Sequence, residues 1–383
     1  MSNGFLINTS NRIRSTPFTS RNEMAGVKKY TVYNNTLLPT VFKSLKNDYY
    51  HLLENVQLWD VCAQRVIEVK GSKSLSLMQY LFCRDFSNIS SGKAYYAPIV
   101  NFEGGLLNDP VVFCIADNHF LISLSDSDLF NWVSAINNSK EFYSEVKETD
   151  IFTIAIQGPK SENLAQKIFG KEIQNLKYFN FINFPFNEEE IMISKTGYSK
   201  QSGYEILLVN PNKAIMLWDL IMEKGKEFNI RVGCPNMIER VENNLLSYGN
   251  EMTNKDLPYD CGLGNFCNLD TDYDFIGKTA LLKQKDIGFK KNIYKIHFNS
   301  ESEDTPVFYN NLSVFKKDNE IGKATSIVWS PKHSKYVGFL ISSKNIVNDL
   351  NDYYILDKVK FDLLDITWKT ILLKYWRNKK WNI

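Results

Sequence analysis

Two segments of the chain match each other, and this internal repeat limits the possible folds more than any other feature of the sequence. The segment IEVKGSKSLSLMQYLF (67–82) aligns without gaps to IAIQGPKSENLAQKIF (154–169), with seven identities in sixteen positions. In both, a short strand rich in β-branched residues ends at a glycine, and a polar helix start with apolar helical spacing follows. The repeat predicts a duplicated module of the α+β class that uses the same strand–glycine–helix corner twice.

The rest of the chain divides into an α+β part and a β-rich part. Apolar alternation predicts strands, and helical spacing predicts helices, around the repeat. The strands are expected near 94–100, 110–115, 120–124, 179–184, 190–194 and 204–209, and the helices near 129–136, 211–228 and 235–246. After a short helix near 279–287, short alternating segments separated by Asn, Asp and Gly predict a β-rich C-terminal domain.

Composition and charge exclude several kinds of partner. Hydrophobic residues make up 44% of the 383 positions and charged residues 23%, as in ordinary globular proteins that are long enough for two or three domains. The formal net charge is +2, so no strong field favours nucleic acid or anionic lipid. No apolar run approaches the roughly 18 residues of a membrane-spanning helix. The six scattered cysteines fit free thiols in a reducing compartment, and we expect a cytoplasmic protein.

The N-terminal region allows two interpretations. Residues 1–24 carry three arginines, many Ser and Thr residues and a single acid, Glu23, which is a composition that a transit peptide can have. The alternative, which we prefer, is an N-terminal arm over residues 1–48 that packs on the core. The core is then expected over 49–289 and the C-terminal β domain over 290–383.

Several common catalytic motifs are absent from the sequence. There is no C-x-x-C pair and no metal-ligand spacing among the four histidines, so we expect no metal site. The segment GLGNFC (262–267) lacks the third glycine of a dinucleotide fingerprint, and neither a Walker A sequence nor a G-x-S-x-G elbow occurs. If the protein is an enzyme, the reactive groups are expected to belong to its substrate and cofactor.

Glu205 is the most unusual charged residue of the expected strands. In SKTGYSKQSGYEILL (194–208), strand alternation puts Glu205 on one face with Leu207 and Val209, while Tyr204 and Ile206 lie on the other. A carboxylate among aliphatic side chains loses hydration and needs a hydrogen-bonding partner. That partner is either an Arg or Lys of the protein or a ligand edge with paired N–H donors.

Two further charged residues stand out. Asp109 lies between Leu107 and Val111 on the alternation that follows a Gly-Gly hairpin turn in YYAPIVNFEGGLLNDPVVF (95–113). Without a ligand, a turn or capping residue is its commoner role. In NMIERVENNLLSYGNE (236–251), Arg240 faces asparagines on an expected helix, and an exposed surface cation is the commoner role of such an arginine.

Together these motifs resemble the folate-dependent aminomethyltransferase family, whose founding member is the T-protein of the glycine cleavage system. They run in family order over about residues 45–280, and they comprise Gly104, Gly105 and Asp109; Gln157, Gly158 and Pro159; residues 196–206; Arg240 and Glu242; Tyr248 and Gly249; and residues 274–278. The segments GGLLNDPV, GYSKQSGYEI and CPNMIERVE are most similar to the dimethylsulfoniopropionate demethylase branch of this family.

The resemblance implies a duplicated α/β folate-binding core in three subdomains, a C-terminal β-barrel domain and tetrahydrofolate as the cofactor. The residues that it implies for binding the cofactor are Glu205, Tyr198, Arg240 and Gln157. Glu205 would accept hydrogen bonds from the ring N3–H and the 2-amino group of the pterin, which match the two carboxylate oxygens.

The resemblance also implies a methyl transfer from a sulfonium to N5 of tetrahydrofolate. Asp109 is the expected catalytic residue, which would stabilise the positive charge that develops on N5 and accept its proton. Tyr95 and Tyr96 are expected to bind the sulfonium substrate through cation–π contacts. Trp59 is a further candidate, but core packing is the simpler role for it.

The sequence leaves alternatives open. A T-protein aminomethyltransferase would need a lipoyl carrier protein as its partner. A folate-binding or iron–sulfur assembly factor of the same fold would lack turnover, and it is expected to carry a motif that PYDCGLGNFC (258–267) does not match. A diverged paralogue would have lost the activity, since the resemblance fades after Phe339. A homodimer is also left open.

Overall fold

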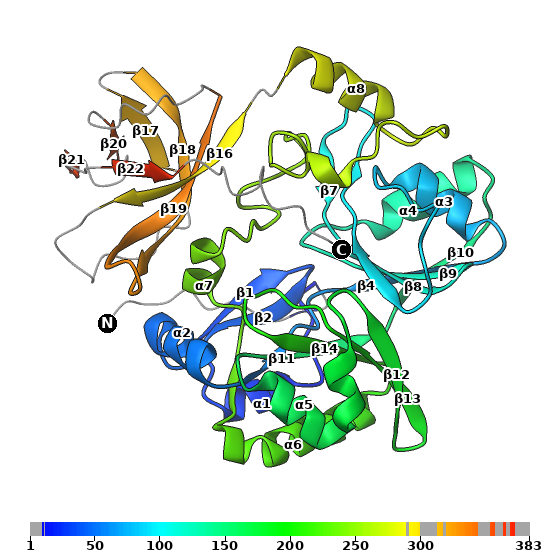
Figure 1. Cartoon of the computed structure of the whole chain (residues 1–383), viewed down its shortest axis with the longest axis vertical. Helices are drawn as coiled ribbons and strands as arrows, with labels where there is room; N and C mark the ends of the chain where they lie inside the picture. The colour runs from blue at the N-terminus through cyan, green and yellow to red at the C-terminus, as the bar shows by residue number, and fades with distance from the viewer. Residues whose placement is uncertain are drawn as a thin grey trace.

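The computed structural model describes Ser10 and residues 12–288, 291–298, 312–316, 319–343, 353–356, 363–364 and 368–371. It contains three larger β-sheets, which Figure 1 shows in cyan, in green and, for the C-terminal sheet, in yellow to red. Within the described residues, no helix is both long enough and apolar enough to cross a membrane.

The first half of the core is a five-stranded sheet with two helices on one face. Its strands, in spatial order, are β10 (Glu145–Thr149), β4 (Val66–Lys70), β9 (His119–Ser123), β8 (Val111–Ala116) and β5 (Lys93–Tyr96). The helices α3 (Ser74–Leu81) and α4 (Phe130–Ser139) bury Leu77, Met78 and Val133 against this sheet. The small pair β6 (Ile99–Val100) and β7 (Leu106–Asn108) extends from its edge.

The second half repeats this arrangement. Its six strands, in spatial order, are β12 (Phe181–Phe186), β13 (Glu189–Ser194), β14 (Gly203–Leu208), β11 (Phe152–Gln157), β3 (Gln57–Asp60) and β15 (Arg231–Gly233). The helices α5 (Ser161–Phe169) and α6 (Pro211–Lys224) cover one face, where Leu164, Leu217 and Trp218 are buried. The other face packs toward the five-stranded sheet, through a cluster that contains Leu207 and Phe113.

The two halves exchange one strand each. Strand β3 precedes β4 in the chain but pairs with β11 in the second sheet, and β10 precedes β11 but pairs with β4 in the first sheet. The order β10-β4-β9-β8-β5 therefore corresponds to the order β3-β11-β14-β13-β12. The chain passes from one sheet to the other at residues 61–65 and 150–151, so neither half can complete its sheet alone.

The strand–glycine–helix corner of the internal repeat is present in both halves with nearly the same backbone. The corner glycines are Gly71, with a φ of 125°, and Gly158, with a φ of 126°. The helices that follow start at Ser74 and Ser161, three residues after each glycine. The duplicated α+β fold expected from the sequence is confirmed.

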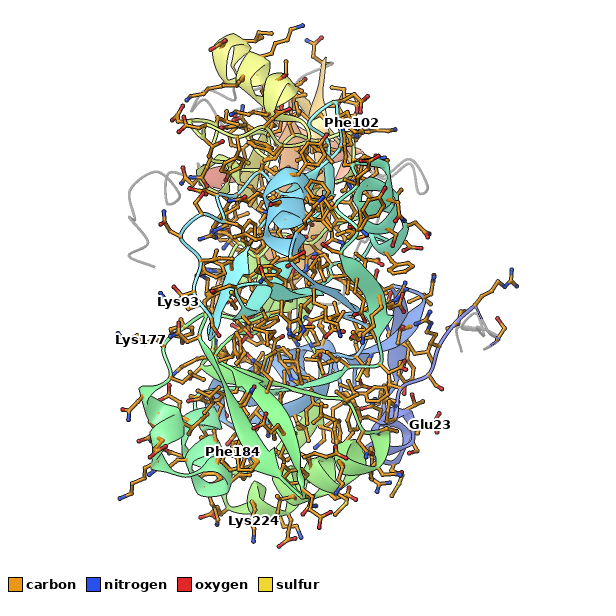
Figure 2. The ribbon with its side chains drawn as sticks, turned by 90° about the vertical axis from the view of Figure 1, so that its right-hand side faces the viewer. Glu23, Lys93, Phe102, Lys177, Phe184 and Lys224 are labelled. Carbon is orange, nitrogen blue, oxygen red and sulfur yellow. The ribbon has the colours of Figure 1, made fainter. Side chains whose placement is uncertain are left out.

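The two sheets also meet along one edge. The backbone N–H of Ala94 on β5 donates to the carbonyl of Phe179 at 2.7 Å, and the N–H of Phe181 on β12 donates to the carbonyl of Gly92 at 2.9 Å. Figure 2 shows Lys93 and Lys177 on this edge, with Phe184 and Lys224 farther down the second half. The inter-sheet space is therefore bounded on this side by continuous backbone hydrogen bonding.

An N-terminal segment packs on the core through a buried carboxylate. It comprises α1 (Thr19–Met24) and the hairpin of β1 (Lys29–Tyr33) and β2 (Thr36–Val41), and α2 (Leu45–Glu54) follows. Asp60, at the end of β3, accepts hydrogen bonds from Thr16 Oγ1 at 2.5 Å and from Asn22 Nδ2 at 2.9 Å. Residues 1–9 and 11, on which part of the transit-peptide interpretation rests, lie outside the described residues.

The C-terminal strands form a seven-stranded sheet. In spatial order they are β21 (Leu363–Leu364), β20 (Tyr353–Leu356), β17 (Leu312–Lys316), β18 (Asn319–Ser330), β19 (Lys335–Ser342), β16 (Asn292–Phe298) and β22 (Trp368–Ile371). Helix α8 (Lys278–Ile287) precedes them. A C-terminal β domain is thus present, and among the described strands the sheet has two open edges, without pairing that closes it into a barrel.

The expected elements differ from the structure mainly in their ends. The strand expected over 94–100 is interrupted before β6 by Pro98, which has no N–H to donate. The helix expected over 235–246 is shorter: α7 (Met237–Glu242) begins after Asn236, whose side chain accepts hydrogen bonds from the N–H groups of Ile238 and Glu239. It ends before Asn244, which has a φ of 60°.

The duplicated corner allows a matched test of backbone crowding. Both glycines have the same positive φ, so alanine is strained at either one by about 1–3 kcal/mol. A Cβ at Gly158 would also lie 2.2 Å from the carbonyl oxygen of Asn55, whereas at Gly71 the nearest atom is 3.7 Å away. We expect Gly158→Ala to lower the free energy of unfolding, measured by urea denaturation, clearly more than Gly71→Ala. Equal losses would contradict this account.

Candidate active site

Glu205 points into the space between the two sheets. Its neighbours on the adjacent strands are Ala155 on β11 and Ser194 on β13, and its side chain shares a face with Leu207 of the inter-sheet cluster. Tyr204 and Ile206 lie on the opposite face, against α5 and α6. The alternation in the sequence therefore placed the carboxylate on the inner face of the sheet, where it is 7% exposed.

The hydrogen-bonding partners of Glu205 are neutral. The hydroxyl of Thr196 donates to Oε2, and the side chain of Gln64, in the crossing from β3 to β4, adds a second hydrogen-bonding interaction. Burial raises the pKa of Glu205. Across the described ranges of the chain, no Lys, Arg or His forms an ion pair with it. This carboxylate can therefore accept hydrogen bonds from a ligand with paired N–H groups.

Gln157 holds the loop between β13 and β14. Its Oε1 accepts a hydrogen bond from the Ser199 hydroxyl at 2.7 Å. A Cβ at Gly197 or Gly203 would lie within 2.3 Å of Gln157 Nε2, so only glycine fits at these two positions without displacing the side chain. The Nε2 group is buried without a hydrogen-bond partner within the described structure. Gln157 thus fixes the loop that carries Thr196 and Tyr198.

Asp109 has one oxygen bonded and one oxygen unpaired. The hydroxyl of Tyr96 on β5 donates to Oδ2 at 2.8 Å. Oδ1 is buried and has no hydrogen bond of good geometry among the residues described, and the nearby Ser125 hydroxyl also stabilises the ionised carboxylate. Because of this burial, the pKa of Asp109 is raised to about 6. The unpaired oxygen can accept a proton or face a cation.

Four tyrosines from separate parts of the chain lie close enough to Asp109 to interact with its charge, and we call them the tyrosine cluster: Tyr33, Tyr96, Tyr198 and Tyr248. Each interacts electrostatically with the Asp109 carboxylate, and burial raises the pKa of each phenol. The hydroxyl of Tyr198 donates to the carbonyl of Leu246 at 2.8 Å, and that of Tyr248 donates to the carbonyl of Leu106 at 3.0 Å. The phenols of the tyrosine cluster therefore stay uncharged at neutral pH.

The loop between β13 and β14 connects the two carboxylates. Thr196 donates to Glu205, and Tyr198, two residues later, belongs to the tyrosine cluster around Asp109. Glu239 on α7 fixes the far end of this loop by accepting a hydrogen bond from the N–H of Lys200 at 2.8 Å. Residues 196–198 thus connect Glu205 with the tyrosine cluster near Asp109.

The structure separates the two aromatic residues expected to bind the substrate. Successive residues of a strand point to opposite faces, so Tyr96 reaches Asp109 while Tyr95 does not. The ring of Tyr95 lies 5.2 Å from the guanidinium carbon of Arg84, and its hydroxyl accepts a hydrogen bond from the N–H of Ser90. Trp59 is fully buried and donates to Gln57 Oε1 at 2.8 Å, as expected of a core residue.

Arg240 is paired inside the protein. It donates to Glu251 Oε2 at 3.1 Å, to the carbonyl of Leu245 at 3.0 Å and to Ser326 Oγ on β18 at 2.5 Å. It is 8% exposed, so the surface role is wrong for this arginine. It also interacts with Tyr198. Arg240 therefore ties α7 and the C-terminal sheet to the loop that reaches the candidate site, and its part in cofactor binding stays a prediction.

The sequence did not reveal the residues that position the two buried acids or lie next to them. Thr196 and Gln64 satisfy Glu205, while Tyr33 and Tyr248 complete the tyrosine cluster. Thr196 and Tyr248 lie within the motifs of the family, but no charge or periodicity marks them. Tyr33 lies on an N-terminal hairpin, and no local pattern predicts that it approaches Asp109.

Comparisons with known proteins agree with this fold. The family described as the GCVT N-terminal domain matches residues 18–271. The dimethylsulfoniopropionate demethylase DmdA of Ruegeria pomeroyi is 39% identical over 323 residues, which cover 84% of this chain and 87% of that protein. An aminomethyltransferase of Thermoanaerobacter pseudethanolicus is 31% identical over 316 residues, which cover 80% of this chain and 84% of that protein.

A solved structure shows the same fold. The crystal structure of glycine cleavage system aminomethyltransferase T from Bartonella henselae superposes with a TM-score of 0.82, over 94% of this chain and 97% of that chain, at 17% sequence identity. The family match over residues 18–271 and the identity to the two relatives thus define a chain of the aminomethyltransferase class. The protein belongs to the GCVT aminomethyltransferase family, and it is an enzyme that transfers one-carbon groups with tetrahydrofolate.

The raised pKa of Asp109 predicts how stability depends on pH. Between the ordinary carboxyl pKa near 3.8 and the folded value of about 6, the folded state binds more protons than the unfolded state. We therefore expect the free energy of unfolding of the native protein to fall relative to that of Asp109→Asn as the pH rises from 4.5 to 6, and to level off above 7. The full difference, from below pH 3 to above pH 7, is about 3 kcal/mol, of which about 2 kcal/mol falls above pH 4.5. Urea denaturation of both proteins across this pH range measures it, and a constant difference would contradict the assignment.

Proposed function

We propose that this protein moves a methyl group from dimethylsulfoniopropionate to N5 of tetrahydrofolate, giving methylmercaptopropionate and 5-methyltetrahydrofolate. The observation that carries the proposal is the Asp109 carboxylate, which has one unpaired oxygen among four uncharged tyrosine rings. A carboxylate and aromatic faces are the groups that recognise a methylated cation. The 39% identity to a dimethylsulfoniopropionate demethylase supports the same substrate.

The binding role that we propose for Glu205 follows from its partners. Glu205 lies between the sheets, next to the hydroxyl of Thr196 and the side-chain amide of Gln64. Among the described residues, no lysine, arginine or histidine forms an ion pair with it. The ring N3–H and the 2-amino group of a pterin form a donor pair that fits the two oxygens of a carboxylate. Such charge-assisted hydrogen bonds offset the cost of burying Glu205. Gln157 holds the loop between β13 and β14, and Tyr198 lies on this loop. We therefore propose that both residues shape the cofactor site.

The chemistry needs little beyond positioning. Tetrahydrofolate supplies N5 as the methyl acceptor, and the sulfonium carbon is already activated for attack. The carbon–sulfur bond breaks with its electron pair going to sulfur, and the new carbon–nitrogen bond uses the lone pair of N5. Holding nitrogen, carbon and sulfur in line at near-attack distance supplies several kcal/mol, up to roughly 7–11 in ideal cases.

Asp109 has the properties needed to stabilise the positive charge in this step and to accept the proton. A positive charge disappears from sulfur and develops on nitrogen, and a nearby carboxylate stabilises it at both positions. With a pKa of about 6, Asp109 is mostly ionised at neutral pH and yet basic enough to accept the proton that N5 loses. Tyr96, which donates to Oδ2, leaves Oδ1 as the oxygen that faces the reacting atoms. We therefore propose Asp109 as the catalytic residue.

The second candidate function is that of a glycine cleavage aminomethyltransferase. It is favoured by the 31% identity to the aminomethyltransferase of Thermoanaerobacter pseudethanolicus, over 80% of this chain. Such an enzyme takes its one-carbon unit from an aminomethyl group on a lipoyl carrier protein. The tyrosine cluster favours the sulfonium substrate, because aromatic faces and a carboxylate suit a free methylated cation.

One assay separates the two functions. The purified full-length protein is given tetrahydrofolate with either dimethylsulfoniopropionate or an aminomethyl-loaded lipoyl carrier protein, and the folate products are separated by chromatography. We expect 5-methyltetrahydrofolate from the sulfonium and no methylenetetrahydrofolate from the carrier. The reverse result would assign the protein to the second function, and no product from either donor would indicate a paralogue without turnover.

The role of Glu205 predicts a selective loss of folate affinity. Glu205→Gln keeps the shape but loses the charge, and one of its terminal atoms becomes a donor that faces the pterin donors. Hydrogen bonds to charged groups contribute about 1.5–3 kcal/mol, so the dissociation constant for tetrahydrofolate is expected to rise roughly 10- to 150-fold. Calorimetry measures it, with Glu190→Gln on the exposed part of β13 as the control. Unchanged affinity in Glu205→Gln would reassign the residue to structure.

A further inference from the structure

The N-terminal hairpin is fixed to the segment that neighbours Asp109. Its turn, Asn34-Asn35, has positive φ values of 48° and 57°, as a tight hairpin turn requires. The backbone N–H of Asn34 donates to Asp126 Oδ1 at 2.8 Å, and its buried side chain donates to the carbonyl of Ser125 at 2.9 Å and to that of Ala63 at 3.1 Å. The hairpin tip is therefore held at a defined place on the core.

Ser125 connects this hairpin tip to the candidate catalytic residue. Its hydroxyl donates to the carbonyl oxygen of Asp109 at 3.4 Å, and its N–H donates to Asn108 Oδ1 at 2.9 Å. Asn108 in turn donates from Nδ2 to the carbonyl of Ser125 at 3.0 Å. The same residue thus bonds to the hairpin on one side and to the Asn108-Asp109 segment on the other.

Tyr33, the last residue of β1, immediately precedes this anchored turn. Its phenol is hydrogen-bonded to the Ser125 hydroxyl, and it lies close enough to Asp109 and Tyr198 for their charges to raise its pKa. It is the member of the tyrosine cluster that comes from outside the duplicated core. The phenols of Tyr96, Tyr198 and Tyr248 each donate to an acceptor that belongs to the core itself.

We propose that Tyr33 is a specificity-determining residue: its ring forms one wall of the space beside Asp109 Oδ1, so that the N-terminal hairpin selects donors with a methylated cation over neutral molecules of the same shape. This inference rests on the proposed function for the identity of the substrate. An uncharged phenol ring attracts a cation through its electron-rich face, and it offers a neutral isostere no comparable attraction. The carboxylate of Asp109 adds charge attraction from the other side.

The test compares two ligands that differ in charge and hardly in shape. Dimethylsulfoniopropionate is compared with 4-methylpentanoate, in which a neutral CH replaces the sulfonium sulfur. Calorimetry on the full-length protein, with 5-methyltetrahydrofolate present to prevent turnover, gives the ratio of the two affinities. We expect Tyr33→Leu to reduce this ratio roughly 2- to 30-fold, the range that cation–π contacts span, and Tyr33→Phe to keep it. Tyr143→Leu, at a residue 69% exposed, is the matched control and should leave the ratio unchanged.

A second measurement covers the case in which Tyr33→Leu fails to fold. A fluorinated phenylalanine at position 33 keeps the ring shape but weakens its attraction for cations, so the ratio should fall stepwise with fluorination while the melting temperature stays constant. A ratio that does not change with the ring at position 33 would overturn the inference, and so would native protein that does not prefer the sulfonium.

The outcomes separate this inference from the proposed function. If native protein methylates folate from dimethylsulfoniopropionate but the affinity ratio does not change on substitution of Tyr33, then the proposed function holds and the role of Tyr33 is overturned. If the ratio depends on Tyr33 but no methylated folate forms, then the hairpin selects a cationic ligand and the proposed reaction fails.

Discussion

The reciprocal exchange of strands between the two sheets is the constraint on which the rest of the structure depends. Strand β3 completes the second sheet and β10 completes the first, so the chain must pass twice between the halves. One passage, at residues 61–65, carries Gln64 to Glu205 and Ala63 to the N-terminal hairpin. The same topology that makes the halves inseparable therefore brings polar groups into the space between them, where the candidate site lies.

Buried acids without cationic partners give this space its chemical character. Glu205 and Asp109 belong to this space, whereas Asp60 lies on the helix-covered face of the second sheet, and among the described residues none of the three forms an ion pair with a lysine or arginine. Burial of such groups costs stability unless every oxygen is hydrogen-bonded. At Asp60 the N-terminal segment supplies the donors. At Asp109 one oxygen stays unpaired, which fits a group that is kept ready for a ligand.

The C-terminal sheet meets the core at the buried ion pair of Arg240 and Glu251, to which the sheet adds the hydroxyl of Ser326. Arg240 on α7 binds Glu251 and Ser326, and Ser326 lies in the bulge of β18 with a φ of 53°. Removing one partner of such a pair leaves the other charge uncompensated, which is strongly destabilising. Because Arg240 also interacts with Tyr198, the attachment of the C-terminal sheet bears on the loop that joins Glu205 to the surroundings of Asp109. We propose a domain boundary near residue 289, between the end of α8 at Ile287 and the start of β16 at Asn292.

The sequence by itself determined the duplicated fold and the strand face that Glu205 shares with Leu207. These follow from local rules, since the period of a strand and the φ of a corner glycine are fixed by nearby residues. Only the tertiary structure decided that Tyr95 faces away, that Arg240 is paired with Glu251, and that Tyr33 reaches Asp109. Contacts between residues that are distant in the chain depend on which sheets pack together, and a single sequence carries no local signal of that packing.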